Sequence, residues 1–343
     1  MKENRLVNFD FMRIVALFAI IVGTFVAPAL QTTPVTEFDW DLLNVIMTLS
    51  RFGFPLLLML SGAFMLDETA EPDVRGILKN YVLRLSIVFA VWSFVYALLG
   101  EIFTIGEGSF FTRFLTGSDH LWLILAIIGL YLITPILRAF VRIADKTLLE
   151  YTLLLSFLFA FLLPYFAWFM EWNALSEMLD LLKIRTVGGY FGYYLAGFYL
   201  TRYTPDRSKR ILLYVISIIA LFTTAFLTQT NSEFFGVAVD QFYHLLSPAT
   251  AVWSVAVFLL LYNLKFGIVS PAAERVLYNL SAVSFSAFIV HDFFFRLIGA
   301  IGITAASLTP FVTVPLFCLL VFCLSLLTGL VLKRIPFFGK YLG

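Results

Sequence analysis

The stretch DFMRIVALFAIIVGTFVAPALQ, residues 10–31, decides the fold of this chain. Its two charges lie within its first four residues, and the rest is an apolar run long enough to cross a bilayer as an α-helix. Nine further apolar segments follow, so that the predicted spans are 10–31, 43–66, 78–99, 121–142, 149–170, 186–201, 211–229, 245–264, 277–300 and 310–332. We therefore predict an all-α, polytopic transmembrane helical bundle of about ten spans, which forms a single domain over residues 1–343.

The composition favours a membrane protein over every soluble class. Hydrophobic residues make up 61% of the chain and charged residues 13%, against about 45–50% and about 25% in soluble domains. No hydrophilic stretch is long enough for a separate soluble domain, and we expect no nucleic-acid partner. The first apolar stretch lacks a small-residue cleavage site after it, so we interpret it as a span and not as a removed signal peptide. Cys318 and Cys323 share a late apolar run, which argues against a disulfide framework.

The distribution of Lys and Arg over the connections predicts the orientation of the chain. Sixteen of the 23 basic residues fall at the two termini or in the alternate connections that share one side of the membrane with them. Only Arg113, Lys183 and Arg185 fall on the opposite side. Because cytoplasmic segments carry the excess of basic residues, we predict that both termini are cytoplasmic.

Charged residues inside the predicted spans are costly, so each of them requires a physical reason. Arg13 follows Asp10 by three residues, and it either snorkels to the inner interface or offers a binding charge to an anionic ligand. Arg84, near the inner end of the third span, is open to the same snorkelling interpretation. Asp292 and Arg296 form an i,i+4 pair that can neutralise itself within one helix.

The second predicted span also carries an arginine, Arg51, in SRFGFPLLLMLSGAFML. We expect it near the outer end of that span, where it would anchor the helix at the interface. Pro55 and the Ser61–Gly62 pair predict a bend or close helix packing in the same segment.

The three histidines are candidates for general bases, but no motif in the chain singles one out. His120 opens the fourth span, His244 stands at the outer start of the eighth, and His291 lies in the outer half of the ninth. A lone histidine near an interface is more often a hydrogen-bonding anchor than a catalyst. The sequence contains no cluster with metal-ligand spacing, no Gly-rich phosphate loop and no Gly-x-Ser-x-Gly motif, so we expect no metal.

Six segments together resemble a known family. They are NFDFMRIVALFAIIV, RFGFPLLLMLSGAFML, LRLSIVFAVWSFVY, HLWLILAIIGLYLITPIL, GYFGYYLAGFYL and LSAVSFSAFIVHDFFF, in this order along the chain. Each is a weak pattern in an apolar background, but their order makes the set specific. The sequence resembles the membrane acyltransferase 3 family, the bacterial enzymes that O-acylate surface polysaccharides, and in particular its compact ten-span subgroup.

The resemblance implies an integral O-acyltransferase of the bacterial cell (plasma) membrane, embedded in the lipid bilayer. It implies an acyl-CoA co-substrate, usually acetyl-CoA, on the cytoplasmic side, and a hydroxyl of a surface or lipid-linked glycan as the acceptor. It further implies a pocket that opens inward near Asp10, Arg13 and Arg84, which would contact the donor. His291 or His120 would then assist the acceptor, and a homodimer is possible.

This chain departs from the family pattern at one position of the first span. The family carries an Arg or Lys, ten intervening residues and a His that is proposed as the catalytic base; here Arg13 matches the first element, while Thr24 replaces the His. Eleven residues advance a helix by about three turns and about 16.5 Å, so Arg13 and Thr24 share a face. A threonine cannot act as a general base near neutral pH, although it can hydrogen-bond, or become an acylated nucleophile if another base activates it. No sequence neighbour of Thr24 supplies such a base.

Three explanations for Thr24 remain open on the sequence alone. The threonine is an engineered replacement of the histidine, or the chemistry of a natural relative has moved to His120 or His291, or the chain is not catalytic. The last explanation predicts a transporter or export partner of a glycan precursor or small polar solute. A membrane sensor, which would have no cavity reaching both sides, is a further alternative.

Overall fold

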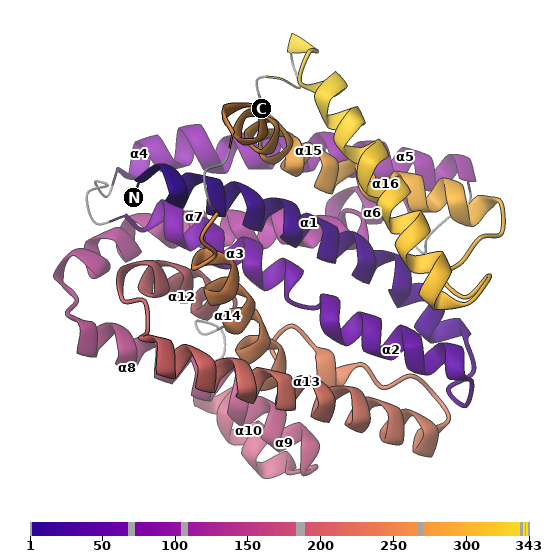
Figure 1. Cartoon of the computed structure of the whole chain (residues 1–343), viewed down its shortest axis with the longest axis horizontal. Coiled ribbons are helices and arrows are strands. Elements are labelled where there is room, and N and C mark those ends of the chain that lie inside the picture. Colours follow the sequence, from indigo (N-terminus) through magenta and orange to yellow (C-terminus); the bar gives the residue numbers. More distant parts are fainter. Residues whose placement is uncertain are drawn as a thin grey trace.

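The computed structural model describes residues 2–67, 73–103, 109–182, 189–266, 270–336, 339 and 341. For residues 2–6, 102 and 103 it describes the backbone alone. Throughout this part of the chain the regular structure is helical, with no strand (Figure 1). The α-helices are α1 (Lys2–Thr32), α2 (Phe38–Ser50), α3 (Gly53–Met65), α4 (Val74–Ile77), α5 (Leu83–Phe103), α6 (Phe110–Thr116), α7 (Trp122–Ile143), α8 (Lys146–Ser156), α9 (Leu163–Phe169), α10 (Asn173–Leu182), α12 (Phe191–Arg202), α13 (Arg207–Phe235), α14 (Pro248–Tyr262), α15 (Pro271–Ala300) and α16 (Pro310–Leu332). The prediction of an all-α membrane bundle is confirmed.

Nine helical segments among the described residues are long and apolar enough to cross a membrane. They are Val7–Thr32, Phe38–Met65, Val74–Glu101, Phe110–Ile143, Lys146–Phe169, Arg207–Phe235, Gln241–Tyr262, Pro271–Ala300 and Pro310–Leu332, and they correspond to nine of the ten predicted spans. The sixth predicted span, 186–201, contains α12, whose 12 residues are too few to cross a hydrocarbon core of about 30 Å at 1.5 Å per residue. Residues 186–188 lie outside the described residues.

Helix α1 occupies the centre of the bundle. It packs against α2, α3, α14, α15 and α16, so that it lies between the α15–α16 pair and the α3–α14 pair (Figure 1). Met12, Ala16 and Ile20, which repeat every four residues, are fully or almost fully buried along one side of it. In this position Asn8, Arg13 and Thr24 of α1 each have a partner within the protein.

The second span is broken in its middle, at Arg51 and Phe52, into α2 and α3. The prediction that Arg51 lies near the outer end of its span is wrong. The helix begins earlier than predicted, at Phe38, because the acidic first turn favours a helix N-terminus there. Gly53 stands at the break because its Cα faces α1: a Cβ on it would lie 3.0 Å from the carbonyl oxygen of Ala16. The Arg51 Nε atom donates to the carbonyl of Tyr243, at 2.8 Å, which satisfies the charge inside the protein.

Two glycines allow α3 and α12 to pack backbone to backbone. A Cβ on Gly62 would lie 1.7 Å from the carbonyl oxygen of Tyr194, and a Cβ on Gly197 would lie 1.8 Å from that of Met59. Small residues at such crossings are typical of membrane helices, where close van der Waals contact replaces the hydrophobic drive. The close packing predicted at Ser61–Gly62 is therefore confirmed, and it fixes α12 even though this helix is short.

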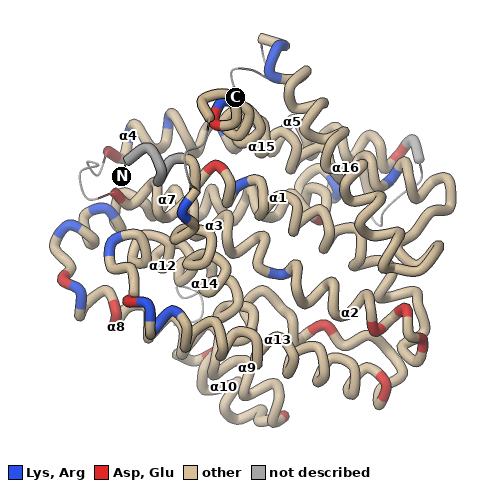
Figure 2. The backbone as a smooth tube through the Cα atoms, in the orientation of Figure 1, with Lys and Arg blue, Asp and Glu red and all other residues tan. Residues whose placement is uncertain are grey.

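Charge is unevenly spread over the two ends of the bundle (Figure 2). Lys and Arg gather at the end that holds α4, the start of α8 and the N-terminus, whereas Asp and Glu gather near the start of α2 and the end of α13. This pattern is the one from which we predicted cytoplasmic termini, and the orientation itself stays a prediction. Lys183 and Arg185, two of the three basic residues predicted outside, lie outside the described residues.

We expect Gly197→Ala to destabilise the protein, because α12 must move away from α3 to admit the methyl group. Overpacking of this kind costs about 1–3 kcal/mol, and more where the obstacle is a backbone atom. A thermal unfolding series in detergent should show a clearly lower Tm for Gly197→Ala. Gly129→Ala is the matched control, because a Cβ on Gly129, within α7, has nothing within 4 Å. Equal Tm values for the two variants would contradict the packing.

Candidate functional site

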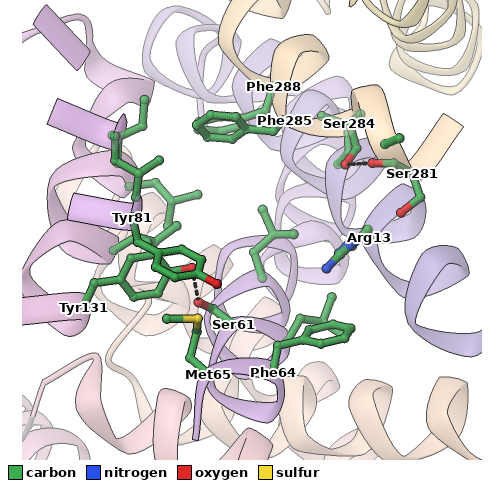
Figure 3. A pocket seen from close by; sticks show the side chains of 18 of the residues that line it. Arg13, Ser61, Phe64, Met65, Tyr81, Tyr131, Ser281, Ser284, Phe285 and Phe288 are labelled. Carbon is green, nitrogen blue, oxygen red and sulfur yellow. Dashed lines mark hydrogen bonds between the residues drawn. The ribbon is translucent and has the colours of Figure 1, made fainter. Parts of the chain in front are cut away.

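A cavity of about 690 Å³ lies between α1, α3, α5, α7 and α15 (Figure 3). Arg13 points into it from α1, across from Tyr81 and Tyr131, while Phe285 and Phe288 close another side. The Ser61 hydroxyl donates to the Tyr131 hydroxyl at 3.0 Å, which ties α3 to α7 beside the cavity. The cavity volume lies in the range of small-molecule and cofactor sites.

One end of the cavity is strongly cationic. Its lining includes Arg13, Arg84, Arg138 and Lys333, whereas Asp10 is its only carboxylate among the described residues. The Arg13 guanidinium lies 3.8 Å from the Asp10 carboxylate and stacks 4.8 Å from the centre of the Phe64 ring. The structure thus brings together the three residues predicted near an inward-opening pocket, Asp10, Arg13 and Arg84, although their role as donor-binding residues stays a prediction.

Two of the cavity's cations, Arg138 and Lys333, were missed on the sequence, because both fall at the ends of predicted spans and were assigned to loops. Arg138 is held by a bond from its Nε to the carbonyl of Met65, at 2.7 Å, and Arg84 by a bond from its Nε to the carbonyl of Tyr341, at 2.7 Å. The spacing of Tyr131 and Arg138, seven residues or two helical turns, was the signal that both face the same side of α7.

The other end of the cavity is apolar and ends at Phe288. Leu17, Leu123, Ile124 and Phe285 line it together with that ring. Anions are therefore favoured at one end of the cavity, and an uncharged chain at the other.

A threonine–histidine pair lies just beyond this apolar end. Thr24 Oγ1 is 3.2 Å from His291 Nε2, so α15 supplies the base that the sequence around Thr24 lacks. His291 is fully buried, and its Nδ1 lies at hydrogen-bonding distance from the carbonyl of Phe288. A carbonyl only accepts, so Nδ1 carries the proton and the neutral ring presents a lone pair at Nε2. Thr24 also lies 3.0 Å from the carbonyl of Ile20, which is the alternative acceptor for its single proton.

The second histidine, His120, packs against the first. The ring centres of His120 and His291 are 5.0 Å apart. His120 Nε2 lies 3.0 Å from the carbonyl of Ile289, so it donates there, and Nδ1 faces the Asp292 carboxylate at 3.7 Å. His244, in contrast, is exposed, and its Nδ1 accepts from the backbone N–H of Leu246, as expected for an anchor.

The Asp292–Arg296 pair forms as predicted, with Arg296 Nε donating to Asp292 Oδ2 at 2.7 Å. It is not isolated, however. The Arg296 Nη2 atom donates to the Ser118 hydroxyl at 2.9 Å, and this hydroxyl donates to Asp292 at 3.3 Å. The pair therefore joins the residues before α7 to α15 beside His120, a role that no local pattern in the sequence indicates.

No group of three or more His, Cys, Asp and Glu side chains in the described part of the chain is arranged to hold a metal ion. The site therefore consists of the cationic cavity, the Thr24–His291 pair and the His120–Asp292–Arg296 cluster.

These features define a class: a multi-spanning helical membrane protein with an internal cavity that is cationic at one end and apolar at the other, and with two buried histidines beyond the apolar end. The family model for an acyltransferase domain, of the acyltransferase 3 type, matches residues 6–330, so the chain belongs to this family of membrane acyltransferases. The resemblance noted in the sequence is thereby confirmed over nearly the whole chain. A search of curated proteins and a search of solved structures return no match.

We expect Asp292→Asn to lower stability, because it leaves the guanidinium of Arg296 without its charged partner. The side chains are 17% and 26% exposed, so the cost should be about 2 kcal/mol, below the 3–5 kcal/mol of a fully buried pair. A double-mutant cycle with Arg296→Gln, followed by thermal unfolding in detergent, measures this coupling. Additive losses in the cycle would show that the two side chains do not stabilise each other.

Proposed function

We propose that this protein is an integral membrane O-acyltransferase of the bacterial cell membrane. It would transfer an acyl group, in the first instance acetyl, from cytoplasmic acyl-CoA to a hydroxyl of a surface or lipid-linked glycan. One observation carries the proposal: a cavity with a cationic end and an apolar end points, at its apolar end, towards a histidine whose Nε2 lies 3.2 Å from the hydroxyl of Thr24.

The cationic end matches the charged part of the donor. The phosphates of a CoA are anionic, and charge-assisted hydrogen bonds from arginine are among the strongest that a protein offers to phosphate. We propose that Arg13 and Arg84 contact these phosphates, and that Arg138 and Lys333 add to the positive electrostatic potential of the cavity. Asp10, at 3.8 Å from Arg13, orients its guanidinium. The apolar end would then enclose the uncharged arm that carries the thioester.

The histidines match the chemistry. Transfer to a hydroxyl requires a base that removes the hydroxyl proton as the oxygen attacks the thioester carbon. His291 is suited to this role, because the Phe288 carbonyl fixes its tautomer and leaves Nε2 to accept. His120 is a positioning residue in this proposal: it packs on His291 and is itself held by the carbonyl of Ile289.

A transfer assay tests the proposal. Purified protein in lipid nanodiscs, given radiolabelled acetyl-CoA and a membrane glycan fraction, should move label into the glycan. His291→Gln should lower the rate at least about a hundredfold, since general bases contribute about 10²–10⁴-fold. His244→Gln, an exposed histidine outside the site, should leave the rate unchanged. Binding of acetyl-CoA without transfer to any glycan fraction would favour the transporter or export partner instead.

Donor binding gives a second test. We expect Arg13→Gln to raise the Kd for CoA about tenfold, because it removes one charged hydrogen bond worth about 1.5–3 kcal/mol. The Kd is measured by calorimetry on protein in nanodiscs. Arg207→Gln is the control, because Arg207 begins α13 on the surface and does not line the cavity. An unchanged Kd in Arg13→Gln would refute the assignment of the cationic end to the donor.

A further inference from the structure

We propose that Thr24 is itself acylated during the reaction and carries the acyl group from CoA to the acceptor. This inference rests on the proposed acyltransferase function. It deepens that function by naming the residue that accepts the acyl group from the thioester of CoA. Its starting point is the pair in which Thr24 Oγ1 lies 3.2 Å from His291 Nε2.

The direction of the histidine decides which hydroxyl it can activate. The proton on Nδ1 is engaged by the Phe288 carbonyl, so His291 has one lone pair to offer, at Nε2. That lone pair already faces the Thr24 hydroxyl. The hydroxyl that His291 is placed to deprotonate is therefore a hydroxyl of the protein.

The hydroxyl of Thr24 needs only a rotation to become the nucleophile. In many helices a threonine donates to the carbonyl four residues earlier, and the Ile20 carbonyl lies at 3.0 Å for this purpose. Turning the O–H bond from Ile20 to His291 moves the proton and no heavy atom. A nucleophile within hydrogen-bonding reach of a base, which is in turn oriented by a third group, is the arrangement that activates serine and threonine nucleophiles.

The cavity leads towards this pair along two helices. Leu17 lines the cavity from α1, and Thr24 follows it by seven residues, about two turns and about 10.5 Å, on the same face. Phe288 lines the cavity from α15, and His291 follows it by less than one turn. A donor whose phosphates lie at Arg13 would thus extend its thioester end along α1 in the direction of Thr24.

The two steps balance without any further reactant. In the first, Thr24 Oγ1 bonds to the acyl carbon, the carbon–sulfur bond breaks, and the threonine proton passes through His291 Nε2 to the departing thiolate, which leaves as CoA thiol. In the second, the acceptor hydroxyl gives its proton to Nε2 and its oxygen bonds to the acyl carbon. The Thr24 ester then breaks, and Thr24 Oγ1 takes the proton back.

A carrier at this position would separate donor and acceptor in space. Within the span Val7–Thr32, Thr24 lies eight residues from one end and seventeen from the end at which Arg13 lies. Under the predicted orientation, the acyl ester would stand in the outer half of the membrane after CoA has left on the inner side. The two substrates would then never need to occupy the protein at the same time.

Isotope exchange without acceptor tests the inference directly. Wild-type protein in nanodiscs receives unlabelled acetyl-CoA and free CoA labelled in its adenine, with no glycan present. A covalent carrier exchanges the acetyl group, so label should appear in acetyl-CoA, and acid-quenched protein should carry one acetyl group on the peptide that contains Thr24. Thr24→Ser should retain exchange, whereas Thr24→Val and His291→Gln should lower it at least about a hundredfold.

The outcomes separate the two proposals. Absence of exchange in the wild type, or an acetyl group on another residue, would overturn the role of Thr24. If the glycan transfer assay still succeeds in that case, the acyltransferase function stands and transfer is direct. If transfer and CoA binding are both absent, the proposed function fails as well. Thr24→Val removes the hydroxyl at nearly constant volume, and its Tm, measured beside that of Thr24→Ser, shows whether the fold is kept.

Discussion

A polar group inside the hydrocarbon core of a bilayer cannot hydrogen-bond to water, so it needs a partner within the protein. This constraint organises the interior of the protein. Asp292, Arg296 and Ser118 hydrogen-bond to one another between α15 and the residues before α7. Arg51, in the middle of its span, is satisfied by the backbone of Tyr243. These contacts connect helices through directional hydrogen bonds, which apolar packing lacks. They thereby help to position α15, the helix that carries His291.

The same constraint explains why α1 can carry both ends of the site. A helix with a charge at one end and a hydroxyl eleven residues later needs protein around it on all sides, and α1 has five helices as neighbours. Arg13 contacts the carboxylate of Asp10 and the ring of Phe64, and Thr24 lies at hydrogen-bonding distance from His291. Because α1 and α15 pack against each other, the cationic end and the Thr24–His291 pair are held by the same two helices.

Local features of this fold could be predicted from the sequence, whereas contacts between distant segments could not. Apolar length identified nine of the spans, and the i,i+4 spacing identified the Asp292–Arg296 pair. The contact of α12 with α3 through Gly62 and Gly197 could not be predicted in full, because composition does not reveal which helix a glycine faces. Arg51 was misplaced because a run of apolar residues hides the break of the helix within it.

The site was predictable to a similar extent. Helical geometry put Arg13 and Thr24 on one face, and the family pattern pointed to His120 and His291 as further candidates. Nothing in the periodicity of α1 or α15 encodes that these helices are neighbours, so the contact between residues 267 positions apart needed the structure.

The break between α2 and α3 has a consequence for the membrane in which the protein works. A bilayer thinner or thicker than the bundle forces straight helices to tilt as a body, at a modest cost for every ångström of mismatch. Here α3 packs backbone to backbone on α12, whereas α2 packs on α1, α13 and α16 and joins α3 at Arg51 and Phe52. A change of angle at this joint would let α2 adjust to the lipid thickness. Helix α3, with its wall of the cavity, would keep its place against α1 and α12.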